Sequence, residues 1–276
     1  MNEEKLKSLL IKSGAVFLFI FCTAPFVWMI AVSLSGHPDF LSSKVKFLFT
    51  FNNYVQILET NSVHLLAYLR NSIIISLASG FFAVLFAGLA AYAVTRMKFK
   101  GRIVIPLILL GISMFPQISI VGYLFKILTN LGWINTYYAL IFPYITLGLP
   151  LALWIMMSQL SQLSKELDEA ALVDGATRFQ ILRKIIFPIA LPGAFSTFIL
   201  VFIYSFNEFL FALMFTIDYH ARTIPVGIAL FEGLHGQIPW GYIMAGSVVA
   251  VIPVILLIAV FQKYIIQGLT EGSVKG

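Results

Sequence analysis

Long stretches without a charged residue are the feature of this sequence that most limits its fold. Four of them carry no Asp, Glu, Lys or Arg, namely 14–34, 71–94, 103–125 and 137–160. A bilayer core about 30 Å thick is crossed by roughly 20 apolar residues in a helix. Each stretch is therefore predicted to be a transmembrane helix.

Two further stretches complete the prediction. Residues 189–216 carry a single charged residue, the acid Glu208, and residues 243–261 are uncharged. Only 11% of the chain is charged and 60% is hydrophobic, whereas an average soluble domain has about 25% charged residues. We predict an all-α integral membrane protein with about six transmembrane helices, in which residues 1–276 form a single transmembrane domain.

The distribution of basic residues predicts the orientation, because loops rich in Lys and Arg stay cytoplasmic. If the N-terminus is cytoplasmic, thirteen of the 18 basic residues lie inside. The outer segments then hold only Lys44, Lys46, Arg70, Lys126 and Arg222. Six spans return the C-terminus to the cytoplasm. This topology also explains the net charge of +6, and no nucleic acid is expected as a partner because the basic residues form no continuous stripe.

Several classes of site and function do not fit the sequence. The single cysteine, Cys22, lies in the first span, and the four histidines form no i, i+4 pair, so no metal site is expected. The chain has no Gly-Lys dipeptide and hence no phosphate-binding loop of an ATPase. An ion-driven carrier or a membrane-embedded enzyme would need several ionisable groups within the spans, where only Glu208 is found deep in one.

The one long cytoplasmic loop, 161–188, has the densest charge in the protein. Ser164 is placed to cap a short helix from Lys165 to Val173. The first turns of this helix carry the acids Glu166, Asp168 and Glu169. Acids near a helix N-terminus are favoured by the helix dipole.

A second short helix is predicted directly after this one. Asp174-Gly175 is a strong turn signal, and Thr177 with Gln180 fits a capping box. Pro188 is expected to separate this second helix from the fifth span. Such a helix–turn–helix could dock onto another protein, or it could be an ordinary amphipathic loop. The physical pattern leaves both interpretations open.

The spacing of residues in this loop resembles the EAA motif of permease subunits of bacterial and archaeal ATP-binding-cassette importers. Glu169-Ala170-Ala171 is followed after three residues by Gly175 and after nine more by Ile185-Ile186-Phe187-Pro188. Phe187 stands where the family usually has leucine. The resemblance extends over nearly the whole chain. The segments 207–210 and 268–276 are similar to the maltose-type carbohydrate permeases.

This resemblance implies a function for the chain as a whole. It implies one permease subunit that forms half of the translocation pathway of an importer for carbohydrate, a di- or oligosaccharide such as maltose or trehalose, in a bacterial or archaeal plasma membrane. The expected partners are a second homologous permease subunit, two ATP-binding-cassette ATPase subunits, an extracellular or periplasmic sugar-binding protein and membrane lipid. The chain itself is then no enzyme and binds no cofactor, because ATP and Mg are used by the partner ATPase.

The resemblance also implies roles for individual residues. In the family the EAA loop seats a coupling helix in a cleft of the ATPase. The residues expected to take part in this coupling are Glu169, Ala170, Ala171, Asp174, Gly175 and Arg178.

Glu208 is the remaining candidate for function. An ionisable side chain deep in a span is costly unless it faces water or a partner. With Tyr204 and Asn207 it could line a polar pathway for sugar hydroxyls. Alternatively, Glu208 could be structural and bond a facing helix or the partner permease. The sequence does not decide between these two roles.

Overall fold

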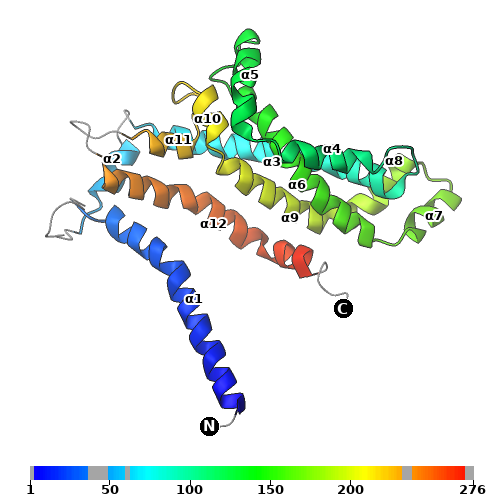
Figure 1. Ribbon diagram of the computed structural model, residues 1–276, viewed down its shortest axis with the longest axis horizontal. Coiled ribbons are helices and arrows are strands. Elements are labelled where there is room, and N and C mark those ends of the chain that lie inside the picture. Colours follow the sequence, from blue (N-terminus) through cyan, green and yellow to red (C-terminus); the bar gives the residue numbers. More distant parts are fainter. Residues whose placement is uncertain (1–2, 37–48, 60–62, 232–237, 271–276) are drawn as a thin grey trace. The chain divides into compact units, whose positions relative to one another are not determined.

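The computed structural model describes residues 3–36, 49–59, 63–231 and 238–270, and these are almost entirely helical (Figure 1). One isolated antiparallel bridge, Ser35 with Phe49, is the only β pairing recorded among them. The elements are α1 (Glu3–Ser33), α2 (Asn52–Glu59), α3 (Leu65–Arg96), α4 (Val104–Ser113), α5 (Gln117–Asn130), α6 (Tyr138–Gln162), α7 (Glu166–Val173), α8 (Arg178–Ile181), the π-helical η1 (Leu182–Ile186), α9 (Phe187–Phe206), α10 (Leu210–Phe215), α11 (Ile224–Ala229) and α12 (Trp240–Thr270).

Five helices in the described residues are long and apolar enough to cross a membrane, and a bent helix pair makes a sixth if it counts as one span. This confirms the predicted all-α class with about six spans. The stretches predicted at 14–34, 71–94, 137–160 and 243–261 fall within or almost wholly within α1, α3, α6 and α12. Of the tail used in the family resemblance, residues 271–276 lie outside the described residues.

The stretch 103–125, predicted as one span, is divided in the structure. Helix α4 ends at Ser113, α5 begins at Gln117, and the two are bent by 94° (Figure 1). Pro116 lies in the break with extended backbone, φ −67° and ψ 125°. A proline cannot donate the helical hydrogen bond and disfavours helical geometry in the residue before it. The apolar composition alone did not reveal this break.

The stretch 189–216 also differs from the prediction, at both ends. Its helix begins at Arg178 and continues through η1 into α9, which ends at Phe206. The separation expected at Pro188 is absent, because the π-helical turn before it accommodates a residue that lacks an N–H. The helix ends at Phe206, and α10 is a separate short helix.

The chain divides into two compact units, Met1–Leu66 with Ile228–Ile252, and Ala67–Gly227 with Pro253–Gly276. In the first unit the Asn53 amide donates to the carbonyls of Ser33 (2.8 Å) and Ser35 (2.9 Å) and so fastens α2 to the end of α1. A Cβ at Gly241 would come within 2.7 Å of the Asn53 amide, so the start of α12 also packs on this residue.

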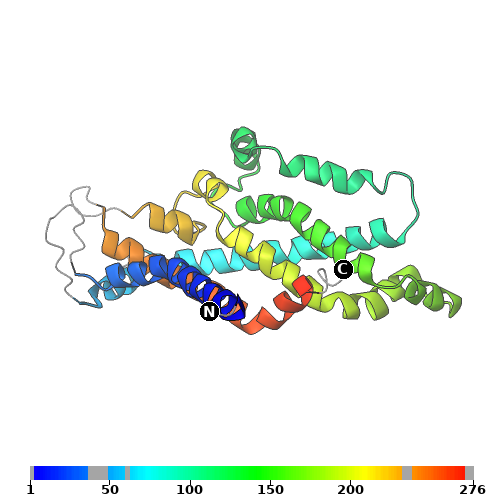
Figure 2. The same ribbon diagram turned by 60° about the horizontal axis from the view of Figure 1, so that its bottom comes forward.

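The second unit has a core in which α3, α6 and α9 run side by side (Figure 2). Small residues line the contact, including Ala83, Ala87 and Ala152, which are fully buried. A Cβ at Gly148 of α6 would lie 2.7 Å from Val201 of α9, so only glycine allows this approach. Small residues let membrane helices pack closely where lipid provides no hydrophobic drive for association.

Candidate functional site

The segment predicted to couple to a partner lies at the end of α6 and contains α7, a glycine turn and α8. Helix α7 begins at Glu166, one residue later than expected, and carries the three predicted acids in its first turn. The N-cap of α7 is Lys165, which makes no side-chain cap bond, and the hydroxyl of Ser164, one residue earlier, accepts a hydrogen bond from the Glu166 N–H at 3.2 Å.

The turn after α7 depends on Gly175, whose φ is +81°. Its N–H donates to the Leu172 carbonyl (3.1 Å), and the Ala176 N–H donates to the Ala171 carbonyl (2.9 Å). These two bonds form a Schellman motif, which favours glycine at the left-handed position. The predicted turn at Asp174-Gly175 is therefore confirmed.

The capping box that follows is also confirmed. The Thr177 hydroxyl accepts from the Gln180 N–H (3.3 Å), and the Gln180 side chain accepts from the Thr177 N–H (2.7 Å). Because α8 continues through η1 into α9, this box starts the helix of the fifth span. The coupling segment is thus joined to a membrane span by continuous helix.

Helix α7 also takes part in a buried ion pair that was not predicted from the sequence. Arg96, at the end of α3, lies with one Nη atom 3.4 Å from an Asp168 carboxylate oxygen, and the two side chains are only 2% and 6% exposed. The other Nη of Arg96 donates to the carbonyls of Leu160 (2.9 Å) and Leu163 (2.7 Å) at the end of α6. One guanidinium group therefore joins α3, α6 and α7.

Tyr92 adds a second link between the same helices. Its hydroxyl donates to Asp168 at 3.2 Å from one turn earlier on α3, and Arg178 lies close enough to this phenol to affect it electrostatically. From the sequence alone, Arg96 indicates only a cytoplasmic loop and Asp168 only the N-terminus of a helix. The i, i+4 spacing places Tyr92 and Arg96 on the same face of a helix, which is visible in the sequence. Their common partner, Asp168, is not, because it lies 76 positions after Tyr92.

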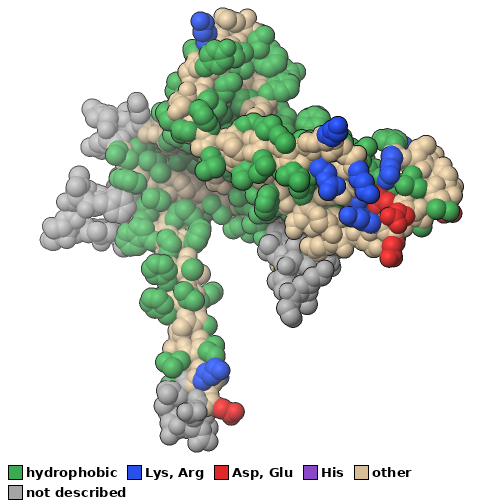
Figure 3. Space-filling view, turned by 45° about the vertical axis from the view of Figure 1, so that its right-hand side comes forward, with side chains coloured by type: hydrophobic (Ala, Val, Ile, Leu, Met, Phe, Trp, Pro, Cys, Tyr) green, Lys and Arg blue, Asp and Glu red, His purple; other side chains and the backbone are tan. Residues whose placement is uncertain are grey.

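Five of the six residues predicted to couple are exposed, and Ala171 is not. Glu169, Ala170, Asp174, Gly175 and Arg178 are exposed on this segment. Ala171 is buried in the core of the chain itself, so it brings α7 close to its own bundle. The exposed surface also includes apolar side chains, with Val173 88% and Phe179 67% exposed. Figure 3 shows Lys and Arg gathered with Asp and Glu at this end of the unit.

Glu208 lies in the break between α9 and α10 and is 7% exposed. One of its oxygens accepts from the Tyr144 hydroxyl at 2.6 Å and from the Ala212 N–H at 3.1 Å, and the other accepts from the Phe211 N–H at 2.9 Å. The carboxylate therefore caps the start of α10 and holds it to α6. Both oxygens already have donors from the protein.

Tyr204 and Asn207, the two neighbours predicted to share a pathway with Glu208, are exposed. The Tyr204 hydroxyl accepts from the Gln117 side chain at 3.1 Å, which links α9 to the start of α5. The Asn207 amide donates to the Ile203 carbonyl of its own helix at 2.8 Å. Tyr204 and Asn207 thus differ from the buried Glu208 carboxylate in their exposure.

A polar cluster at the other end of the bundle was not predicted. Asn135, with φ +62°, donates to Asp218 at 2.8 Å and accepts from the N–H groups of Ile217 and Asp218. The hydrogen bond from Asn135, aided by those from His220, lowers the pKa of Asp218 to about 2. Among the residues that the structure describes, no group of three or more His, Cys, Asp or Glu could hold a metal ion.

Comparison with known proteins is consistent with this architecture. Residues 83–271 match the family described as binding-protein-dependent transport system inner membrane component. The trehalose/maltose transport system permease protein MalG of Thermococcus litoralis is 55% identical over 100% of both chains. The trehalose transport system permease protein SugB of Mycobacterium tuberculosis is 40% identical, over 91% of this chain and 92% of the relative.

Solved structures share the fold at low sequence identity. A chain of a bacterial transporter that imports the acidic polysaccharide alginate superposes with a TM-score of 0.75 at 20% identity, covering 96% of this chain and 98% of that chain. A chain of the MetNI methionine transporter gives a TM-score of 0.60, also at 20% identity, over 74% and 95%. At this identity the likeness establishes the arrangement of helices alone.

Proposed function

Since the chain belongs to the binding-protein-dependent transport system inner membrane components, we propose that it imports a di- or oligosaccharide such as trehalose or maltose. Support for the substrate comes from the relative named for trehalose and maltose, which is 55% identical along its whole length, and from the one named for trehalose at 40%. Other relatives above 30% identity include one named for sulfoquinovosyl glycerol transport. The sugar named for these relatives thus differs from one to another, and the substrate of this chain is tested separately below.

Membership of the family confirms several predictions from the sequence. The chain is the multi-pass inner-membrane permease of an ATP-binding-cassette transporter that works with a binding protein, and the ATPase is a separate chain. It follows that the chain is no enzyme and that ATP and Mg belong to the partner. The more detailed assembly is part of the proposal: a second homologous permease, two ATPase subunits and an external sugar-binding protein.

The proposed mechanism couples the ATPase to the membrane spans through residues 161–188. The exposed Glu169, Asp174 and Arg178 would make polar contacts in an ATPase cleft, and Val173 would fill an apolar part of it. The observation that carries this proposal is the buried Arg96–Asp168 pair, which fixes α7 to α3. A displacement of α7 would therefore move α3 through this pair and α9 through the helix that begins at Arg178.

The proposed pathway for sugar uses the exposed faces of Tyr204 and Asn207. Aromatic faces and amides suit the apolar ring faces and the hydroxyl groups of a sugar. The sequence left the role of Glu208 open, and its three hydrogen bonds favour the structural role. Glu208 would then support the pathway by holding α10 in place.

The coupling proposal can be tested with Gly175→Pro in proteoliposomes that contain the chain, its partner permease, the ATPase and the binding protein. Gly132→Pro is a matched control, because Gly132 (φ +67°) closes a Schellman motif after α5 with the same pair of bonds, from Gly132 to Thr129 (3.0 Å) and from Trp133 to Leu128 (2.9 Å). Both variants disrupt one left-handed turn at a helix end, but only one lies in the coupling segment.

We expect Gly175→Pro to assemble in the membrane yet to lose at least tenfold of both sugar uptake and sugar-stimulated ATP hydrolysis. Gly132→Pro should retain most of both. Equal losses in the two variants, or full activity of Gly175→Pro, would contradict coupling through this turn. Uptake of trehalose, maltose and an unrelated oligosaccharide by the wild type tests the substrate separately. A preference for the unrelated sugar would contradict the proposed substrate but not the function as a permease.

A further inference from the structure

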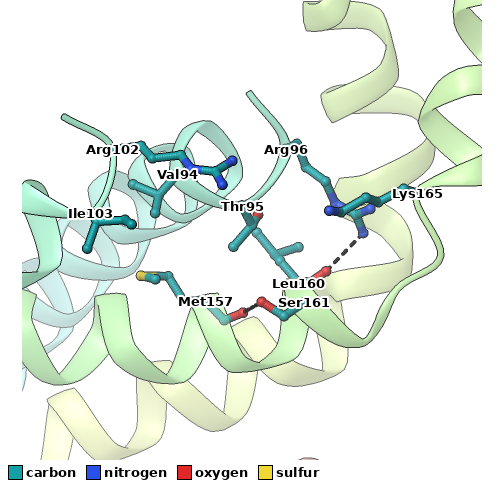
Figure 4. Close-up of a pocket in the computed structure, with 9 residues that line it drawn as sticks. All are labelled: Val94, Thr95, Arg96, Arg102, Ile103, Met157, Leu160, Ser161 and Lys165. Carbon is teal, nitrogen blue, oxygen red and sulfur yellow. Dashed lines mark hydrogen bonds between the residues drawn. The ribbon is translucent and has the colours of Figure 1, made fainter. Parts of the chain in front are cut away.

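A cavity of about 330 Å³ lies where α3 and α6 end, next to the coupling segment (Figure 4). Its lining comes from the end of α3, the turn before α4, the last turns of α6 and the residue before α7. The lining residues are Val94, Thr95, Arg96, Arg102, Ile103, Met157, Leu160, Ser161 and Lys165.

The polar part of this lining is cationic. It contains Arg96, Arg102 and Lys165 and no acid. Arg96 is already neutralised by Asp168, but Arg102 and Lys165 are exposed and take part in neither of the ion pairs recorded among the described residues. In Figure 4 Arg102 lies on one side of the lining residues and Lys165 on the other. Two like charges that share a cavity favour an anion between them.

The hydroxyl groups in the lining add little to anion recognition. Thr95 donates its proton to the Ala91 carbonyl at 2.7 Å, and Ser161 donates its proton to the Met157 carbonyl at 2.7 Å. An anion here must therefore be held chiefly by the guanidinium of Arg102 and the ammonium of Lys165. A phosphate group suits this pair, because arginine offers it a planar fork of donors and lysine a compact charge.

The rest of the cavity is apolar and lies next to α4, a helix that touches the core only through partly buried residues such as Leu109. Val94, Ile103, Met157 and Leu160 supply hydrocarbon surface, and Ile103 is 65% exposed. The adjoining α4 has no buried residue at all. Since α3 and α6 are membrane spans, their ends lie at the boundary between hydrocarbon and water. The ligand is then expected to carry both a phosphate and hydrocarbon chains.

We propose that this cavity binds the headgroup phosphate of a membrane phospholipid between Arg102 and Lys165, with the acyl chains lying along α4. Basic pockets between transmembrane helices bind anionic headgroups in this way on the cytoplasmic side of a membrane. The site is independent of the transported sugar. It places a lipid directly beside Arg96, the residue that joins α3 to α7.

The test compares lipid retention by native mass spectrometry of the complete transporter in detergent. The variant combines Arg102→Gln with Lys165→Gln, and the control combines Lys98→Gln with Lys100→Gln. The control removes the same charge from exposed positions of the neighbouring turn that do not line the cavity. Each is titrated with phosphatidylglycerol, with diacylglycerol of the same chains, and with inorganic phosphate.

We expect the wild type and the control to retain phosphatidylglycerol, and the cavity variant to bind it at least tenfold more weakly. Diacylglycerol should bind weakly to all three because it lacks the phosphate. An equal loss in the control would overturn the proposal by assigning the binding to general surface charge. If inorganic phosphate binds as tightly as phosphatidylglycerol, the proposal of a lipid ligand is wrong and the cavity is a site for a free anion. If diacylglycerol binds as well as the phospholipid, the phosphate contact is wrong.

Discussion

Asp168 and Glu208 are both buried carboxylates in the second unit, but the protein stabilises them in different ways. Asp168 faces the guanidinium of Arg96, so its charge is balanced by an opposite charge. Glu208 belongs to neither ion pair recorded among the described residues and accepts bonds from Tyr144 and two backbone N–H groups. One acid is held by a charge on another helix, and the other is held mainly by its own local backbone.

The difference indicates what each acid does. A charge pair between α3 and α7 connects elements far apart in the chain, and it must be broken or carried along when α7 moves. A carboxylate that caps α10 stabilises the junction at which α9 ends and α10 begins. Asp168 is therefore suited to transmit displacement, whereas Glu208 is suited to maintain the shape of the α9–α10 junction.

The largest effect is expected for Asp168→Ala, which leaves the Arg96 guanidinium buried without its counter-charge. Removing one partner of a buried ion pair costs about 3–5 kcal/mol. The measurement is the free energy of unfolding by denaturant titration in detergent. Asp174→Ala, an exposed acid on the same segment, should change it by less than about 0.5 kcal/mol.

Combining Asp168→Leu with Arg96→Met should recover a large part of that loss, because a buried pair is often replaced by apolar residues without cost. The double variant should nevertheless remain impaired in sugar-stimulated ATP hydrolysis if the pair transmits motion. A double variant with normal coupling would show that the pair only stabilises the fold.

For Glu208 the substitutions to Ala and Gln should separate stability from transport. Glu208→Ala leaves three buried donors without an acceptor and should destabilise the protein by about 2–3 kcal/mol. Glu208→Gln keeps one oxygen acceptor, so a smaller loss and nearly normal sugar uptake are expected. If Glu208→Gln folds as well as the wild type but no longer transports, the charge itself is needed in the pathway and the structural role is incorrect.

The two tyrosines that donate to these acids provide a finer comparison. Tyr144 donates to Glu208 at 2.6 Å and Tyr92 to Asp168 at 3.2 Å. Glu208 has fewer charged partners than Asp168 and depends more on its donors. Tyr144→Phe should therefore cost about 1.5–2 kcal/mol and Tyr92→Phe about 0.5–1 kcal/mol. The reverse order in the same unfolding assay would contradict this account of the two sites.

The smallest effect concerns an exposed carboxylate, Asp218, which contrasts with both buried acids. Its pKa in the folded protein is lowered from 3.8 to about 2, chiefly by the hydrogen bond from Asn135. A lowered pKa contributes stability above pH 4, and this contribution is lost as the pH falls toward 2. Thermal unfolding between pH 5 and pH 2 should show this loss for the wild type and a weaker one for Asp218→Asn. An identical pH dependence in the two would rule out this contribution.

The sequence by itself determined the helical membrane class, the positions of most spans and the local structure of the coupling segment. Runs without charge, a Thr-Gln capping box and an Asp-Gly turn depend on residues within a few positions of one another. Hydrophobicity and backbone geometry act at that range, so the turn at Gly175 and the box at Thr177 could be predicted. The prediction of one straight span at 103–125 was wrong for a related reason. Hydrophobicity shows that a segment is apolar but not whether its helix bends, so the 94° break after Ser113 was not predicted.

The tertiary structure alone decided which partners the buried charges found. Arg96 and Asp168 meet because α3, α6 and α7 end at one place, and Glu208 gained Tyr144 because α6 packs against the α9–α10 junction. The burial of Ala171 and the shared cavity of Arg102 and Lys165 likewise follow from packing. The reason is physical: burial makes an unpaired charge costly, but which residues are brought together to pair is set by helix packing over long sequence separations.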